Sequence, residues 1–279
     1  MNVLSLFDGM SCGQIALNRA GITVDNYYAS ELDKYAMSVT QANYPNTVQL
    51  GDVTRWREWD IDWSSIDLLI GGSPCQGFSI AGKQLAFDDP RSKLFFVYVD
   101  IMRHILEESP EVKFMLENVK MKKEYLDIIS GYLGVEPVAI NSAICSPCAR
   151  PRLYWANWEF GQPDEIVSHY TDFIDDYLLM SPGWNKWWGI NSEFQIKKSY
   201  SKLVNECEKG ITMTARQYSS WNGNFILTYE GIAKPGRRSL ANLAGAPSNY
   251  FDGVSQRQAE LMVGNGWTVD VISHIFKSM

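Results

Sequence analysis

One cysteine, Cys75, stands where a side chain could act as a nucleophile. It lies in the run Gly71-Gly72-Ser73-Pro74-Cys75-Gln76-Gly77-Phe78-Ser79, directly after the apolar segment Ile66-Asp67-Leu68-Leu69-Ile70. This pattern predicts a buried strand that turns at two glycines and presents the thiol at its carboxyl end, where open α/β sheets bind ligands. A thiolate is strongly nucleophilic once its proton is removed, so covalent catalysis is the chemistry that this position favours. An isolated cysteine is more often a small buried residue, and it is the neighbouring motifs that favour the nucleophile.

Acidic side chains follow the first three predicted strands. Asp8 lies in Phe7-Asp8-Gly9-Met10-Ser11-Cys12-Gly13, where small residues let a ligand approach the backbone and a helix N-terminus. Glu31, about twenty residues on, stands where acidic residues commonly accept hydrogen bonds from ribose hydroxyls. Asp52 follows the third strand and could receive the exocyclic amine of adenine. Together these positions indicate a site for an adenosyl cofactor.

Further along, Glu117 follows the apolar run Phe114-Met115-Leu116. A desolvated carboxyl group beside the cofactor cleft could hold a proton and donate it in a hydrogen bond to a ring nitrogen. Arg150 and Arg152 flank a proline just before another buried strand, which indicates recognition of an anion or a carbonyl group. Surface ion pairing is the alternative for both arginines.

These residues require a sheet that brings strand ends together. The first 157 residues alternate strand-like and helix-like segments, which predicts a doubly wound, mainly parallel α/β sheet. Residues 158–233 are rich in aromatic and turn residues and predict a small inserted region, and helical patterns return from Ser239 onward. The expected strands are Asn2–Phe7, Val24–Ser30, Thr47–Leu50, Ile66–Ile70, Val112–Leu116, Val135–Ser142 and Leu153–Ala156. The expected helices are Cys12–Ala20, Asp33–Ala42, Ser92–Glu107, Lys123–Tyr132 and Val271–Phe276.

Composition indicates the cellular location of the protein and the kinds of ligand that we expect it to bind. Five cysteines, an odd number, without a recognisable signal peptide favour reduced thiols and a cytoplasmic location. No run of 18 or more apolar residues predicts a membrane span. Cys145 and Cys148 have the spacing of a metal-binding pair but no second ligand pair, so we expect no metal. The net charge of −7 does not by itself indicate nucleic-acid binding, and the basic residues, including Lys234–Arg238, form scattered stretches.

These motifs, in this order, resemble the DNA (cytosine-5) methyltransferases. The resemblance rests on the Phe-Asp-Gly loop, Pro74-Cys75-Gln76, Glu117-Asn118-Val119, the Arg150-x-Arg152 pair and Gly264-Asn265-Gly266, and it spans residues 1–157 and about 237–279. It implies a Rossmann-like catalytic domain over residues 1–157, a target-recognition region over 158–233 and a return to the catalytic domain over 234–279. Double-stranded DNA is the implied partner, and the oligomeric state stays open.

The resemblance also implies a mechanism. The target cytosine rotates out of the duplex, and Cys75 adds to C6 of its ring. Glu117 holds N3 and the exocyclic amine, while Arg152, with Arg150, binds the O2 side and orients Glu117. C5 then takes the methyl group of S-adenosylmethionine, after which the C5 proton and Cys75 are released.

Site residues follow by motif. Phe7 would pack on the cofactor, Glu31 would hold its ribose, Asp52 its adenine amine, and the C-terminal motif would close the pocket. The implied cofactor set is Phe7, Asp8, Gly9, Cys12, Gly13, Glu31, Leu32, Asp52, Val53, Ser73, Pro74, Asn265, Gly266 and Trp267. The implied DNA contacts are Gln76, Ser79, Lys83 and Arg91 in the loop after Cys75, and Lys197, Lys198 and Arg216 in the inserted region.

Three other interpretations remain open at this stage. Cytosine in transfer RNA is an alternative substrate, because the rotated base is chemically the same. A catalytically inactive DNA-binding relative is a second, although Cys75, Glu117, Arg152 and the cofactor loop all persist. A modified group could also replace methyl in the transfer.

Overall fold

The structure, a computed structural model, describes residues 1–74, 93–180, 201–219 and 222–279. Seven of the predicted site residues lie outside this part of the chain: Cys75, Gln76, Ser79, Lys83, Arg91, Lys197 and Lys198. The chain divides into two compact units. The first comprises residues 1–140, 151–162 and 272–279, and the second comprises residues 141–150 and 163–271.

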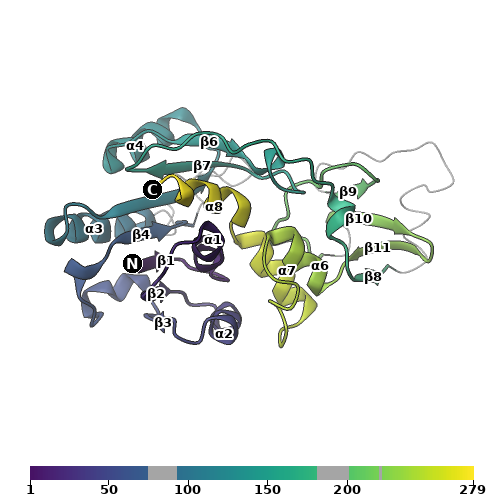
Figure 1. The fold of residues 1–279 in the computed structure, drawn as a ribbon, viewed down its shortest axis with the longest axis horizontal. Coiled ribbons are helices and arrows are strands. Elements are labelled where there is room, and N and C mark those ends of the chain that lie inside the picture. The colour runs from purple at the N-terminus through teal and green to yellow at the C-terminus, as the bar shows by residue number, and fades with distance from the viewer. Residues whose placement is uncertain (75–92, 181–200, 220–221) are drawn as a thin grey trace. The chain divides into compact units, whose positions relative to one another are not determined.

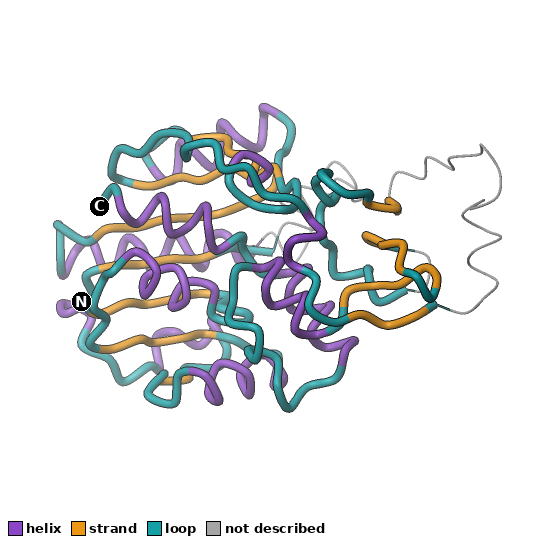
Figure 2. The backbone as a smooth tube through the Cα atoms, turned by 45° about the vertical axis from the view of Figure 1, so that its right-hand side comes forward, coloured by secondary structure: helices purple, strands orange, loops and turns teal. Residues whose placement is uncertain are grey.

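The first unit is built on a seven-stranded sheet with the order β3-β2-β1-β4-β5-β7-β6 (Figures 1 and 2). Its strands are β1 (Asn2–Leu6), β2 (Asn26–Ser30), β3 (Val48–Gln49), β4 (Leu68–Gly71), β5 (Lys113–Val119), β6 (Val138–Asn141) and β7 (Pro151–Ala156). The pairs from β3 through β5 are parallel, and β7 runs antiparallel to β5. The predicted doubly wound, mainly parallel sheet is therefore confirmed, with β7 reversed against β5.

Helices cover both faces of this sheet. Consecutive residues of a strand point to opposite faces, and in β4 Leu69 joins the apolar core formed with α3 (Lys93–Glu108). Ile70 points the other way, toward Gly13 of α1 (Cys12–Ala20). The remaining helices of this sheet's crossovers are α2 (Lys34–Asn43) and α4 (Lys123–Leu133).

Local sequence fixes where these helices begin and end. The Asp33 carboxylate accepts hydrogen bonds from the backbone N–H groups of Tyr35 and Ala36, so it caps the first turn of α2. Gly21 ends α1 with a φ of 77°, a left-handed conformation that glycine adopts without steric cost. These are the signals that placed both helices within one or two residues of their predicted bounds.

The second unit contains a four-stranded sheet with the order β8-β11-β10-β9. Its strands are β8 (Tyr177–Leu179), β9 (Ser201–Val204), β10 (Gly223–Thr228) and β11 (Gly231–Pro235), and Phe225 and Ile232 form its small core. Helices α6 (Arg237–Ala244) and α7 (Gln256–Asn265) belong to the same unit, and α8 (Val269–Lys277) ends the chain. This grouping differs from the expected boundaries at 157 and 233, because α6 and α7 fall with the four-stranded sheet.

Lys234 corrects one expectation from the sequence. It was grouped with scattered basic surface stretches, but its side chain is buried and donates to the backbone carbonyls of Gln217 and Ser219. Burial lowers the pKa of this ammonium group. Lys234 therefore stabilises the interior of the second unit through hydrogen bonds to the backbone and is not part of a basic surface.

The contact between α1 and the sheet generates a stability prediction. An added methyl at Gly13 would lie 2.5 Å from Ile70 Cδ1 and 2.6 Å from the Tyr27 hydroxyl. We expect Gly13→Ala to lower the free energy of unfolding by about 1–3 kcal/mol, because two packed side chains must move. The matched control is Gly131→Ala in α4, where nothing lies within 4 Å of the new methyl. That variant should gain about 0.5–1 kcal/mol from helix propensity. Urea denaturation of both variants tests the contrast, and equal effects would contradict it.

Candidate active site at the carboxyl ends of the parallel strands

Five parallel strands of the first unit end at one edge of its sheet and place polar residues there. β1 leads into Phe7-Asp8-Gly9, β2 into Glu31, β3 into Asp52 and β4 into Ser73, while Glu117 lies near the end of β5. Because the strands are parallel and in register, these segments share the edge where doubly wound sheets bind ligands.

Glu117 and Arg152 form an ion pair at this edge. Arg152 Nε lies 2.8 Å from Glu117 Oε1, and the two side chains are only 14% and 11% exposed. Glu117 lies inside β5, not after it as the sequence suggested, and pairs with Tyr154 of β7. Arg152 faces Val119, so it is the diagonal neighbour of Glu117 on the same face of the sheet. The reversed direction of β7 explains the contact, since its first residues lie beside the last residues of β5.

Asn118 ties the end of β4 to β5, and sequence reasoning gave it no role. Its side-chain amide lies 3.4 Å from the Ser73 carbonyl and 3.3 Å from the Ser73 hydroxyl, and its oxygen accepts from the Val119 N–H at 2.8 Å. Both Asn118 and Ser73 are buried. The chain is therefore anchored two residues before Cys75. The signal in the sequence that could have indicated this anchor is a second polar residue, Asn118, directly after Glu117 at the end of an apolar run.

The loop after β1 has a strained backbone. Phe7, Gly9 and Ser11 have φ values of 59°, 59° and 60°, which lie in the left-handed region that residues other than glycine rarely adopt. The loop is held by two long-range bonds: the Asp8 N–H donates to the Ser30 carbonyl at 3.1 Å, and the Gly9 N–H donates to Glu31 Oε2 at 2.7 Å. Strain of this kind concentrates at ligand sites and persists only where the surroundings enforce it.

Glu31 organises the ends of β1 and β2. Besides the Gly9 amide, it accepts from the backbone N–H groups of Leu32 at 2.7 Å and Asp33 at 2.8 Å. The neighbouring Leu32 side chain is 69% exposed, an open apolar surface at this edge. The role predicted for Glu31, holding a ribose, stays a prediction.

Asp52 and Val53 have different surroundings. Asp52 Oδ1 accepts from the N–H and the hydroxyl of Thr54, both at 2.9 Å, and these bonds lower its pKa. Val53 begins the short helix η1 (Val53–Glu58), and its side chain is buried in the apolar core against α3. Only the backbone of Val53 could therefore meet a cofactor, whereas the Asp52 carboxylate is placed at the strand end as expected.

Asp8 has an unusual environment for a carboxyl group. Oδ2 accepts from the Ser11 hydroxyl at 2.6 Å, and Oδ1 accepts from the Tyr27 hydroxyl at 2.8 Å. Burial raises the pKa of Asp8 to about 6, although these hydrogen bonds act in the opposite direction. Asp8 is thus a loop residue that titrates near neutral pH, a property that the sequence did not reveal.

Arg150 makes its described side-chain contacts with backbone carbonyls. Its guanidinium donates to the carbonyl oxygens of Met213 at 3.0 Å and Gly264 at 3.2 Å, all within the second unit. Glu117 forms its ion pair with Arg152. The same unit contains Asn265, Gly266, Trp267 and the exposed Arg216. Their predicted contacts with cofactor and DNA remain predictions.

The Cys145-x-x-Cys148 pair has no reactive character. Burial raises the pKa of Cys145 to about 11 and that of Cys148 to about 12, so both are protonated thiols at neutral pH. Within the described residues, no cluster of three His, Cys, Asp or Glu side chains is arranged to hold a metal. In the same residues, no helix has the length and apolar character needed to cross a membrane.

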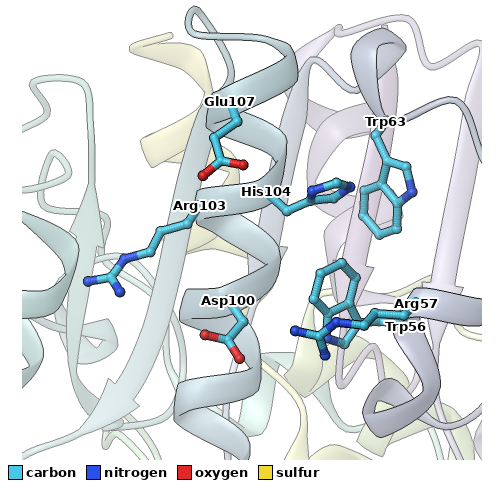
Figure 3. A pocket seen from close by; sticks show the side chains of 7 residues that line it. All are labelled: Trp56, Arg57, Trp63, Asp100, Arg103, His104 and Glu107. Carbon is cyan, nitrogen blue, oxygen red and sulfur yellow. The ribbon is translucent and has the colours of Figure 1, made fainter.

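A cavity of about 450 Å³ in the first unit lies away from this edge (Figure 3). It is lined by Trp56, Trp63 and His104, whose rings contact one another, and by charged residues of α3 and Arg57. Its α3 residues come from the helix half that leads to the amino end of β5. The cavity therefore has no part in the cluster around Glu117.

Comparison with known proteins agrees with this geometry. Residues 1–125 match the family model described as C-5 cytosine-specific DNA methylase. Type II methyltransferase M1.ScrFI of Lactococcus lactis subsp. cremoris is 29% identical over 317 residues, covering 99% of this chain and 77% of the relative. Type II methyltransferase M.NlaX of Neisseria lactamica is 29% identical over 312 residues, covering 99% and 95%. The structure of Entamoeba histolytica methyltransferase EhMeth superimposes with a TM-score of 0.74 at 16% identity, covering 100% and 97%, which shows the shared fold.

The chain has the Rossmann-like fold of these methyltransferase structures. Over residues 1–125 it is similar to the C-5 cytosine-specific DNA methylases, and over nearly its whole length it is similar to type II methyltransferases at 29% identity.

The raised pKa of Asp8 generates a prediction about pH and stability. A carboxyl group whose pKa is raised in the folded state contributes to the free energy of unfolding, and this contribution is fully present below the unfolded pKa of about 4. That contribution is lost as the pH rises through about 6. Relative to Asp8→Asn, the wild-type free energy of unfolding should therefore fall by up to about 3 kcal/mol between pH 4 and pH 7. Urea denaturation of both proteins across this range measures the difference, and a pH-independent gap would contradict the assignment.

Proposed function

We propose that this chain methylates C5 of a cytosine rotated out of duplex DNA, with Cys75 as the nucleophile and S-adenosylmethionine as the donor. The observation that carries the proposal is the Glu117–Arg152 ion pair at the carboxyl end of β5. It adjoins Asn118, which anchors Ser73 two residues before Cys75 in the sequence. A carboxyl group able to bind a base, with its partner cation, therefore stands beside the start of the loop that carries the candidate nucleophile.

S-adenosylmethionine fits the groups at the ends of β1, β2 and β3. A carboxylate offers about four acceptor positions, and Glu31 uses three of them on backbone amides. One position remains for a ribose hydroxyl. The second oxygen of Asp52 has no partner among the described residues and can accept from the adenine amine. The exposed Leu32 side chain offers an apolar surface for the adenine ring.

The chemistry divides between donor and protein. When bound, S-adenosylmethionine supplies an electrophilic methyl group on a sulfonium centre. The Cys75 thiolate forms a bond to C6, and the electron pair of the C5–C6 double bond becomes available at C5. Glu117 binds N3 and the exocyclic amine, while Arg152 binds the O2 side and fixes Glu117, so the charge that develops on the ring is stabilised. After methylation the C5 proton passes to a base, and the sulfur–C6 bond breaks to restore the ring.

Duplex DNA is the substrate that the comparisons favour. The family that residues 1–125 match is that of the C-5 cytosine-specific DNA methylases. The orphan methyltransferase M.Rho11sI of Bacillus phage rho11s is 38% identical over 122 residues, which cover 43% of this chain and 23% of the relative. Transfer RNA as the substrate and an inactive DNA-binding role are the competing outcomes of the experiments below.

Covalent trapping tests the nucleophile and the substrate together. We expect wild-type protein with labelled S-adenosylmethionine and a 5-fluorocytosine duplex library to form a stable adduct, because fluorine at C5 cannot leave as a proton does. Cys75→Ser should form none, while its cofactor dissociation constant stays within about twofold. Denaturing gels and sequencing of the trapped DNA provide the measurement.

The matched control for trapping is Cys207→Ser, which removes an exposed free thiol and should leave the adduct intact. Loss of the adduct in this control, or its persistence in Cys75→Ser, would reject Cys75 as the nucleophile. Turnover on transfer RNA with none on duplex DNA would assign the alternative substrate. Cofactor and DNA binding without any turnover would assign the inactive role.

A second prediction concerns Glu31. Glu31→Ala should weaken S-adenosylmethionine binding by about 1–3 kcal/mol, because a charged hydrogen bond to the ribose is removed. The variant also loses the acceptor for the Gly9 amide, so the strained loop relaxes. Glu31→Gln keeps an acceptor oxygen and should lie between Ala and wild type. Isothermal titration calorimetry measures all three, and equal dissociation constants would contradict the ribose assignment.

A further inference from the structure

Arg150 is held at both ends inside the second unit. Arg150 is only 8% exposed, and its guanidinium donates hydrogen bonds to the carbonyls of Met213 and Gly264. Its backbone N–H donates to Asn141 Oδ1 at 3.1 Å. An arginine used in this way joins two chain segments that are distant in sequence.

The two segments that Arg150 bridges also touch directly. A methyl placed on Gly264 would lie 2.1 Å from the Ala215 nitrogen and 2.2 Å from the Thr214 carbonyl carbon, a separation that no side chain permits. The backbone of Thr214 and Ala215 therefore packs directly against Gly264. The Thr212 hydroxyl adds a bond of 2.6 Å to the carbonyl of Ala149, the residue before Arg150.

The Gly264 carbonyl is one of the last carbonyls of α7, which receive no hydrogen bond from an N–H group within the helix. A cation at this end of a helix both satisfies such a carbonyl and complements the helix dipole. The next residues along the chain are Asn265, Gly266 and Trp267. Arg150 thus fixes the point from which this motif leaves the helix.

The cavity that the described residues form beside Arg150 is too small for a nucleobase. The enclosed cavity there has a volume of about 20 Å³ and is lined by residues that include Met213, Gly266 and Trp267. That volume holds about one water molecule, whereas ligand sites are at least about 300 Å³. The described contacts of Arg150 therefore favour a role in packing over the cytosine contact that the resemblance implied.

We infer that Arg150 is a positioning residue for the cofactor, which acts by clamping Thr212–Arg216 and the end of α7 so that Asn265–Trp267 keeps its binding conformation. Arg152, two residues on, serves the cytosine instead. The inference rests on the proposed function and on the cofactor role that the resemblance implies for Asn265–Trp267.

The test compares Arg150→Gln, Arg150→Lys and Arg152→Gln in the full-length protein. Removing the clamp should raise the KM and the dissociation constant for S-adenosylmethionine in Arg150→Gln by about tenfold to a hundredfold. The kcat at saturating cofactor should change by less than about threefold, because no reacting group is lost. Arg150→Lys, which can bond one carbonyl, should recover part of the affinity. Arg152→Gln should lower kcat by about a hundredfold or more and leave the cofactor KM within about twofold.

Hydrogen exchange provides a readout that does not depend on activity. In Arg150→Gln, amides of residues 212–217 and 264–268 should exchange faster together, while those of β5 and β7 should be unchanged. If Arg150→Gln lowered kcat while its cofactor affinity and its hydrogen exchange stayed unchanged, the inference would be overturned. Arg150 would then be assigned a direct role at the cytosine. If the wild type showed no turnover on any cytosine substrate, the proposed function would fail, and the exchange comparison would still decide whether the clamp exists.

Discussion

The ion pair between Glu117 and Arg152 is the constraint on which the candidate active site depends. Two nearly buried charges add little net stability, because their desolvation offsets their attraction, but removal of one partner costs about 3–5 kcal/mol. The pair exists because β7 reverses direction beside β5, so that a residue at the start of one strand meets a residue near the end of the other. The sheet topology therefore places this carboxyl group at the edge of the sheet and holds its orientation.

The loop after β1 depends on the same edge of the sheet. Two residues other than glycine, Phe7 and Ser11, have left-handed backbones, each at a cost of about 1–3 kcal/mol. The carboxylate of Glu31 and the carbonyl of Ser30 hold the amides of this loop from the end of β2. One carboxylate thus joins two strand ends and still retains acceptor capacity, which makes the loop preorganised for a ligand and not dependent on the ligand for its shape.

The fold was predictable from the sequence because its signals are local. Alternating apolar strands, the Asp33 cap and Gly21 lie within a few residues of the elements they define. Glu31 and Glu117 were predictable as well, because parallel strands bring their ends together. The partners of Arg150 lie 63 and 114 residues away, and the anchor between Asn118 and Ser73 spans 45. No local pattern encodes such distances, so the different contacts of Arg150 and Arg152 could be found only in the structure.

Several cations of the second unit are bound to the protein's own backbone. Besides Arg150, Lys234 donates to the carbonyls of Gln217 and Ser219, and Lys209 donates to the carbonyl of Ser146. A cation engaged in this way contributes little to counterion release, the effect that gives sequence-independent affinity for DNA. With a net charge of −7 for the whole chain, the proposed DNA substrate would have to be recognised through contacts with base edges more than through attraction to phosphates. Cations that bind the protein's own backbone, and the low net charge, are the reason that composition alone gives no sign of nucleic-acid binding.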